Sequence, residues 1–166
     1  DYGTIKYNSS GNSVWVRSYN GPGNNSDIAY AIAVDLSGNV YVTGWSAGSG
    51  TSYDYATIKY NSSGDSVWVR RYNGTDNNYD EAYAIAVDFS GNVYVTGRSA
   101  GIGTSADYAT IKYNSTGVQQ WVQRYNGSAN NSDAANSVAD DGSGNVYVTG
   151  YSNGSGTGED YATIKY

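Results

Sequence analysis

The chain has 166 residues, a formal net charge of -6, and no Cys, Met or His. These absences exclude disulfides, Cys/His metal sites, thiol nucleophiles and any catalytic group that depends on histidine. Only 14% of the residues are charged and no Lys/Arg cluster occurs, so nucleic acid is not an expected partner. No stretch is apolar enough to predict insertion into a membrane.

The sequence repeats with a period of 53 residues. The string Asp-Tyr-Ala-Thr-Ile-Lys-Tyr stands at 54–60, 107–113 and 160–166, and a variant with Gly3 in place of Ala opens the chain at 1–7. A fixed period of this size indicates a repeat architecture. We therefore expect the following units: three repeats over 1–53, 54–106 and 107–159, and an additional strand over 160–166.

Each repeat contains four short strands, which the second copy shows in chain order. Side chains alternate over 54–60, 66–72, 82–88 and 93–97, and the segments between them are rich in Gly, Asn and Ser. Short connections of this kind predict an up-and-down antiparallel sheet. Small residues such as Ala84 and Ala86 suit a crowded inner strand.

Most of these strands carry apolar side chains on both faces, so each sheet needs a neighbour on either side. Radially arranged four-stranded sheets meet that need. The predicted fold is therefore all-β, with β-propeller-type blades of four antiparallel strands. A stacked solenoid is the alternative, although its repeats are usually shorter.

The sequence also resembles a known family, the bacterial and archaeal β-propeller repeat family called SBBP, over its whole length. The motif Asn-Val-Tyr-Val-Thr-Gly stands at 39–44, 92–97 and 145–150, while Trp15, Trp68 and Trp121 share one repeat position. The resemblance implies a propeller in a secreted or surface-attached protein, and so an extracellular or cell-surface location. It implies no catalytic residues.

The order of the strands does not produce a closed ring. By analogy with other propellers, the strand containing Tyr30 is innermost and the strand containing Trp15 is outermost. With positions lettered a to d from the axis outward, the chain reads c-d, a-b-c-d, a-b-c-d, a-b-c. Three blades are too few for a closed propeller. We therefore expect partners that are either further copies of the chain, in a closed ring or an open fibre, or further blades of a longer polypeptide.

The two ends of the chain carry near-duplicate strands, one bounded by Asp1 and Tyr7 and the other by Asp160 and Tyr166. Either strand can occupy the same c position. We predict that one of them completes a split blade, in a neighbouring copy, by β-strand addition.

An Asp-x-Ser-Gly-Asn segment recurs at 35–39, 88–92 and 141–145. Its oxygen atoms suit Ca²⁺, and the candidate ligands are Asp35, Asp88, Asp140 and Asp141. The segment lacks the additional carboxylates and the closing Glu of an EF-hand loop. Because an Asp side chain commonly accepts backbone N–H bonds in a turn, the turn interpretation is favoured. No other cofactor is expected.

Two further rows of carboxylates follow the repeat. One row comprises Asp27, Asp80 and Asp133, and the other comprises Asp1, Asp54, Asp107 and Asp160. They could form an acidic ring or tie neighbouring blades together by accepting backbone N–H bonds, and the ties are favoured. Near-identical repeats argue against the single asymmetric carboxylate pair that glycoside hydrolysis needs.

The tryptophans allow two interpretations. The repeated ones could stack on sugar rings, but packing between blades is favoured because aromatic residues bury much area there. Trp45 falls outside the repeat, since Arg98 and Tyr151 replace it in later copies, so we expect it to be exposed. The basic residues inside strands, Lys6, Lys59, Lys112, Arg17 and Arg70, are expected to be solvated or locally paired.

Glycosylation is a weaker hypothesis. Asn8, Asn61 and Asn114 are sequons at one repeat position on a surface turn. For the whole chain, the favoured function is a structural or adhesive extracellular module that assembles with further copies. A glycan-binding, lectin-like propeller is the alternative. An enzyme ranks last, and no catalytic residue is expected.

Overall fold

The computed structural model describes residues 1–166 and consists of strands joined by turns and loops. It contains no helix long and apolar enough to cross a membrane. The thirteen strands are β1 (Tyr2–Tyr7), β2 (Ser13–Tyr19), β3 (Asp27–Val34), β4 (Val40–Ala47), β5 (Tyr53–Tyr60), β6 (Ser66–Tyr72), β7 (Asp80–Val87), β8 (Val93–Ala100), β9 (Ala106–Tyr113), β10 (Gln119–Tyr125), β11 (Ala134–Asp140), β12 (Val146–Gly154) and β13 (Gly158–Lys165).

These strands form four antiparallel sheets. We call β1–β2 the half-blade, β3–β6 the first full blade, β7–β10 the second full blade and β11–β13 the three-stranded blade. The all-β prediction and the strand order c-d, a-b-c-d, a-b-c-d, a-b-c are confirmed. The structure extends the last c strand, because β13 begins at Gly158 rather than at Asp160.

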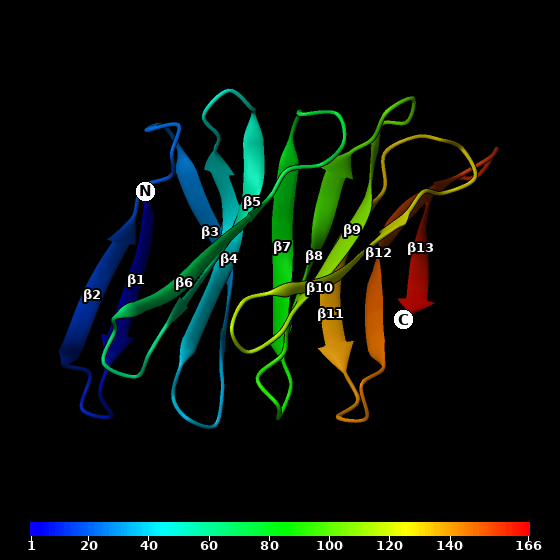
Figure 1. Ribbon diagram of the computed structural model, residues 1–166. Coiled ribbons are helices and arrows are strands. Elements are labelled where there is room, and N and C mark those ends of the chain that lie inside the picture. Colours follow the sequence, from blue (N-terminus) through cyan, green and yellow to red (C-terminus); the bar gives the residue numbers. More distant parts are fainter.

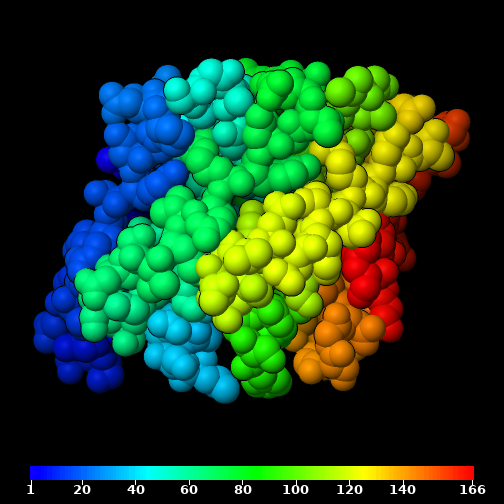
Figure 2. Space-filling view, viewed as in Figure 1, coloured from blue at the N-terminus to red at the C-terminus, as the bar shows by residue number.

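The sheets stand side by side in chain order, with the two termini at opposite ends of the row (Figure 1). The a strands β3, β7 and β11 lie next to one another, as expected for the inner strands of a propeller segment. In the space-filling view the blades follow one another as adjoining bands from blue to red (Figure 2). The row remains open, so the outer faces of the half-blade and of the three-stranded blade have no neighbour.

The hydrophobic core lies between blades rather than within one of them. One cluster joins Tyr41, Tyr55 and Trp68 of the first full blade to Val93, Ile111 and other residues of the second. Equivalent clusters lie at the other two junctions, where Ala84 and Ala86 pack as small inner-strand residues against the last one. Burial of apolar surface between sheets is therefore the main source of stability.

A β-bulge in every a strand was not predicted. The register of β3 with β4 shifts between Ala29 and Ala31, and the same shift recurs in β7 and β11. The facing glycine explains it, because a Cβ on Gly44 would lie 1.9 Å from the Ile28 carbonyl oxygen. A close backbone approach of this kind requires glycine.

Candidate functional site

One tyrosine in each c strand connects its blade to the next one. The hydroxyl of Tyr2 donates to the carbonyl oxygen of Ala56 at 3.1 Å, and Tyr55 and Tyr108 do the same to Ala109 and Ala162 at 3.1 and 3.3 Å. All three tyrosines are buried. Burial raises the pKa of Tyr55 well above its ordinary value, since a charged phenolate would be desolvated there.

The tryptophan of each d strand covers the same junction farther from the axis. Trp15 packs against Tyr60 of the next blade, with ring centroids 5.9 Å apart, and its indole N–H donates to the Ser62 carbonyl. Trp68 repeats these contacts with Tyr113 and Ser115. The interpretation of the repeated tryptophans as packing residues therefore agrees with the structure.

Basic side chains also reach across the junctions, which corrects the expectation that they are only solvated or locally paired. Lys6 donates to the Ser62 carbonyl at 3.0 Å and Arg17 donates to the Gly64 carbonyl at 2.6 Å. Lys59 and Arg70 make the same bonds to Ser115 and Gly117. The acceptors lie 47 to 56 residues away in the sequence, so no local pattern indicated them.

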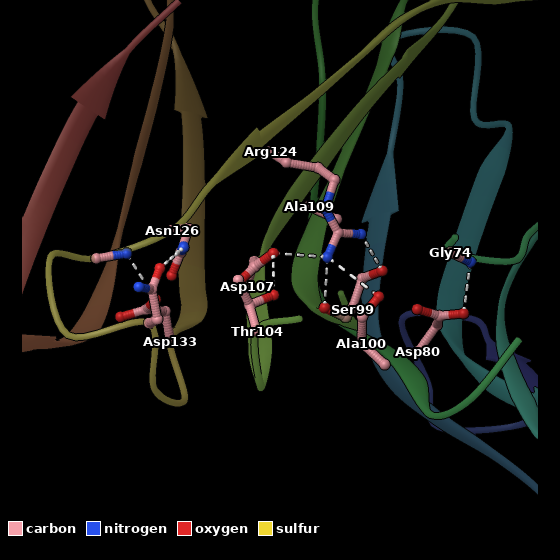
Figure 3. Close-up of polar contacts among 12 residues, drawn as sticks. Gly74, Asp80, Ser99, Ala100, Thr104, Asp107, Ala109, Arg124, Asn126 and Asp133 are labelled. Atoms are coloured by element: carbon pink, nitrogen blue, oxygen red, sulfur yellow. Dashed lines mark hydrogen bonds and ion pairs between the residues drawn. The ribbon is translucent and has the colours of Figure 1, made fainter. Parts of the chain in front are cut away.

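The c-strand carboxylates make different contacts from those expected. Asp54 pairs with Arg71 at 2.9 Å and Asp107 pairs with Arg124 at 2.9 Å, instead of accepting backbone N–H bonds. Arg124 also donates to the Ser99 and Ala100 carbonyl oxygens, so one guanidinium joins three strands (Figure 3). The interpretation of Asp54 and Asp107 as backbone N–H acceptors was wrong.

The a-strand carboxylates do accept backbone N–H bonds. Gly74 N–H donates to Asp80 at 2.7 Å (Figure 3), and Gly21 and Gly127 donate to Asp27 and Asp133. Each glycine belongs to the loop that leads from one blade to the next, so the carboxylate fixes that crossing. Burial raises the pKa of Asp80, against the effect of the hydrogen bonds that it accepts.

The Asp-x-Ser-Gly-Asn segments form hydrogen-bonded turns. Asp88 accepts the backbone N–H groups of Ser90 and Asn92, the Asn92 side-chain amide and the Tyr94 hydroxyl, all at 2.7 to 3.0 Å. Burial alone would raise the pKa of Asp88, but these bonds together hold it below its ordinary value.

Three of the four calcium candidates lie in such turns, and Asp140 is the last residue of β11, directly before one of them. Asp35 repeats the contacts of Asp88, Asp141 accepts N–H bonds from Ser143 and Asn145, and Asp140 accepts the N–H of Gly142. No group of three or more Asp, Glu, His or Cys side chains is placed to hold a metal ion. The turn interpretation accounts for the contacts of these carboxylates, and calcium binding stays a prediction.

Trp45 is buried, with 9% of its surface exposed, so the expectation of an exposed aromatic was wrong. Its ring packs against Tyr53 at a centroid distance of 4.1 Å with the planes tilted by 46°, and its N–H donates to the Tyr30 hydroxyl. Residue 53 varies between the repeats together with residue 45, since Ala106 and Glu159 replace Tyr53, which hid the cluster from a comparison of repeats.

The proposed glycosylation sites lie in turns between c and d strands. The side-chain oxygen atoms of Asn8, Asn61 and Asn114 each accept two backbone N–H bonds within their own turn. Glycosylation at these positions stays a prediction.

The C-terminal flank of the row presents one half of a junction without its partner. We call the outer face of β12 and β13, with Tyr147 and Tyr161, the donor flank. Tyr161 is 88% exposed, whereas Tyr2, Tyr55 and Tyr108 at the same repeat position are 0 to 1% exposed. Its hydroxyl has no carbonyl to bind, and β13 has an unpaired backbone edge.

The N-terminal flank presents the other half, and we call the outer faces of β1–β2 and β3 the acceptor flank. Ile5 is 47% exposed and Tyr7 59%, whereas Ile58 and Tyr60 at the same repeat positions are 1% and 3% exposed. A cavity of about 220 Å³ lies between β1 and β3, lined by Gly3, Thr4, Ile5, Ala29, Tyr30, Ala31, Ile32 and Val42. An internal blade has its a and b strands in that place.

The two flanks are therefore complementary halves of a contact that the chain makes three times internally. They are suited to association with another blade of the same type.

The chain is similar to the regulatory protein FlaEY of Caulobacter vibrioides, with 32% identity over 113 residues, or 60% of this chain, and it spans 11% of that protein's length.

The family comparison matches each repeat separately. A model described as a beta-propeller repeat (SBBP) matches residues 14–50, 67–103 and 120–156, which together make up more than half of the chain. The matched segments contain the d, a and b strands of each repeat, so the resemblance inferred from the motifs is confirmed. The chain belongs to the SBBP beta-propeller repeat family.

Proposed function

We propose that the chain is a structural and interaction module that assembles blade to blade with further copies of itself. The observation that carries this proposal is the pair of open flanks, which expose residues whose counterparts at the internal junctions are buried or half-buried. The counterparts of Tyr161 are buried at all three internal junctions, while those of Ile5 and Tyr7 are buried at the first two and half-buried at the third. Burial of such side chains stabilises association by about 25 cal/mol per Å² of apolar surface.

Closure into a ring of two copies is the favoured outcome, because two copies supply a number of blades within the usual range of four to eight. An open fibre is the alternative geometry for a head-to-tail contact. The proposed setting is extracellular or at the cell surface, as the family resemblance implies, and the proposed role is not enzymatic.

Light scattering after size exclusion tests the proposal on the 166-residue chain. The expected result is a species with twice the 17.6 kDa mass of the chain, or a larger polymer, whose population rises with concentration. As a control, a variant in which Ala replaces Thr116, an exposed turn residue away from both flanks, should associate like the unmodified chain. A species of 17.6 kDa across the micromolar range would contradict the proposal.

Glycan binding is the second candidate function, and one observation favours it. A cavity of about 390 Å³ lies between the turns of the first and second full blades, lined by Asp35, Tyr41, Lys59, Asp88 and the exposed Phe89. An exposed aromatic ring beside carboxylates and an ammonium group suits a sugar ring. Saturable signals on a glycan array that vanish in Phe89→Ala would support it, and an array without saturable binding would remove it.

A further inference from the structure

We propose that a cavity between the second full blade and the three-stranded blade binds one neutral sugar ring through its adjacent hydroxyl groups. The cavity has a volume of about 250 Å³, and its lining includes Asp76, Asn78, Tyr79, Arg98, Ala106 and Ser132. We call it the junction cavity. It lies on neither flank and is separate from the cavity beside Phe89, so this inference goes beyond the proposed self-assembly.

The same place at the junction of the two full blades is filled by three aromatic side chains, those of Trp45, Tyr53 and Tyr79. The centroid of the Tyr53 ring lies 4.1 Å from that of Trp45 and 5.5 Å from that of Tyr79. At the next junction the corresponding residues are small or polar, namely Arg98, Ala106 and Ser132. The loss of these three rings explains why the junction cavity is open.

Polar side chains around the junction cavity are left free by the fold. In the first and third repeats an asparagine of the preceding loop, Asn25 or Asn131, accepts the backbone N–H of the next residue at 2.8 and 2.9 Å. The equivalent Asn78 makes no such bond, and its side chain lines the cavity instead. Asp76 is exposed and stands where the other two repeats have glycine and alanine. A ligand can therefore bind both side chains without breaking a bond of the fold.

Arg98 supplies the positive charge of the cavity, and Glu81 holds it in place. Its Nε and Nη2 atoms lie 3.1 and 3.0 Å from one carboxylate oxygen of Glu81, to which the Tyr83 hydroxyl also donates. The side chain of Arg98 is 35% exposed, whereas that of Glu81 is 14% exposed. The guanidinium is therefore fixed from the buried side and keeps Nη1 as a free donor.

The loop from Asn73 to Tyr79, which forms one side of the cavity, has a fixed shape. Asn77 has a φ of 49°, in the left-handed region, and its side chain accepts a bond from Asn73 at 2.6 Å. The Tyr79 carbonyl accepts the Ala100 N–H at 3.1 Å. The other two repeats form the same turn, so the cavity results from different side chains on a shared backbone.

The side of the cavity formed by β8 and β9 is also fixed. Arg124 donates to the Ala100 carbonyl at 3.1 Å, and the Thr104 hydroxyl donates to Asp107 at 3.2 Å (Figure 3). Binding to a site that is formed in advance loses less conformational entropy, which favours even a small ligand.

The chemistry of the lining selects a neutral ring with adjacent hydroxyl groups. One hydroxyl can donate to the Asp76 carboxylate while its neighbour accepts from Arg98, and the Asn78 amide can do either. Tyr79 is 52% exposed and offers an aromatic face to the C–H groups of a sugar. The Asp76 and Glu81 carboxylates outnumber Arg98, which disfavours an anionic ligand. The volume lies below the roughly 300–1,000 Å³ of sites for larger ligands, so it suits a single ring.

Titration of the 166-residue chain with methyl glycosides, followed by amide chemical shifts in NMR spectra, tests the site. The probes are the neutral methyl glycosides of glucose, galactose and mannose, with methyl glucuronide as the anionic comparison. We expect saturable binding of at least one neutral probe with a dissociation constant of about 1 mM. The shifts should concentrate in residues 76–79 and 104–106. No saturable binding of a neutral probe, or tighter binding of the glucuronide, would overturn the proposal.

Variants at matched repeat positions give a second readout. Asn78→Ala should weaken binding about two- to ten-fold, whereas Asn25→Ala at the same position of the first repeat should leave it unchanged. Ala106→Tyr introduces the ring that Tyr53 supplies at the preceding junction and should abolish binding. Because tyrosine already stands at this position in the first full blade, thermal unfolding should show that the variant folds. Undiminished binding by Ala106→Tyr would overturn the site.

The variant Phe89→Ala separates the junction cavity from the cavity beside Phe89. Binding that persists in Phe89→Ala and weakens in Asn78→Ala supports the junction cavity, whereas the reverse pattern would place the sugar in the other cavity and overturn this inference. None of these substitutions lies on a flank, so the sugar titration and the light-scattering test of self-assembly succeed or fail separately.

Discussion

At the scale of single residues, the junctions depend on backbone acceptors that only a neighbouring blade supplies. The Tyr2, Tyr55 and Tyr108 hydroxyls all donate to an alanine carbonyl of the following sheet. The ring that carries each hydroxyl is fully buried, and a buried hydroxyl without a hydrogen-bond partner would lower the stability of the fold by about 1–3 kcal/mol. The contact therefore fixes how two adjacent blades are aligned, in addition to burying the apolar surface of the ring.

Gly97 gives a direct test of the close approach at the bulge. A Cβ at this position would lie 2.0 Å from the Glu81 carbonyl oxygen, so Gly97→Ala must separate β7 from β8. We expect the free energy of unfolding in urea to fall by about 1–3 kcal/mol or more. Gly3→Ala, where the added Cβ meets open space, is the control and should not destabilise. Equal stability of Gly97→Ala and the unmodified chain would contradict this account.

The turn carboxylates predict a pH dependence of stability. The pKa of Asp88 is lower in the folded chain than its ordinary value near 3.9, so the unfolded chain binds more protons at acidic pH. The stabilisation is complete above the ordinary pKa and is lost as pH falls through the folded one. We expect Asp88→Asn to reduce the loss of stability between about pH 5 and 3.

Urea midpoints measured at several pH values would show the effect, with Asp76→Asn in an exposed loop as the control. Asp35 makes the same contacts and should retain part of the pH dependence in Asp88→Asn. Burial raises the pKa of Asp80, which acts in the opposite direction, so the slope of the unmodified chain is a difference between these effects. An unchanged slope in Asp88→Asn would refute the role of this turn.

Sequence reasoning at this scale succeeded where a side chain serves its own repeat. The turn carboxylates and the buried tryptophans followed from type and spacing alone. The partners of Lys6 and Arg17 lie in the next blade, so their roles required coordinates. The expectation that Trp45 is exposed was wrong because the aromatic residue that covers it, Tyr53, is also unique to its repeat.

At the scale of strands, the alternation of side chains was sufficient to predict nearly every element. The largest differences from the predicted bounds are the start of β7, which begins at Asp80, and the end of β8, which continues to Ala100. The bulges in β3, β7 and β11 were missed because the alternation on either side of them looks continuous. The glycine that faces each bulge was the available signal, since a glycine at the centre of a strand, repeated in every copy, indicates a close approach of another backbone segment.

Trp68 and Trp121 occupy the same repeat position at two different junctions. Trp68 faces a full blade, whereas Trp121 faces the three-stranded blade, which has no d strand. Trp68 is buried, donates to the Ser115 carbonyl and contacts Gly117, whereas Trp121 is half-buried and its N–H has no counterpart acceptor. We expect Trp68→Ala to cost about 3–5 kcal/mol, in the range for a large aromatic residue, and Trp121→Ala clearly less. Chemical denaturation of both variants measures the difference. Equal losses would contradict the view that stability resides between blades.

At the scale of the whole molecule, the chain is a row of sheets that contact only their neighbours. Sequence alone predicted this row of sheets and that it does not close into a ring, since both follow from the number and order of the strands. It left open how the two flanks are covered, because ring, fibre and longer polypeptide all use the same contact. The distinction depends on the free energy of an interface that a single chain does not contain.

A row of this kind predicts uneven local stability. In proteins built from repeats, each unit is stabilised by its neighbours, so inner units are held on two sides and end units on one. The second full blade is covered on both faces by the first full blade and the three-stranded blade. β1 and β2 contact only the first full blade, and β13 leaves its outer face and one edge exposed.

Hydrogen exchange under native conditions measures this directly, because amides exchange through local opening at the free energy of the unit that opens. We expect the slowest exchange in β7, β8 and β9, and the fastest strand exchange in β1 and β2. Uniform protection along the chain would show one cooperative unit and would contradict stability that is divided among the blade junctions.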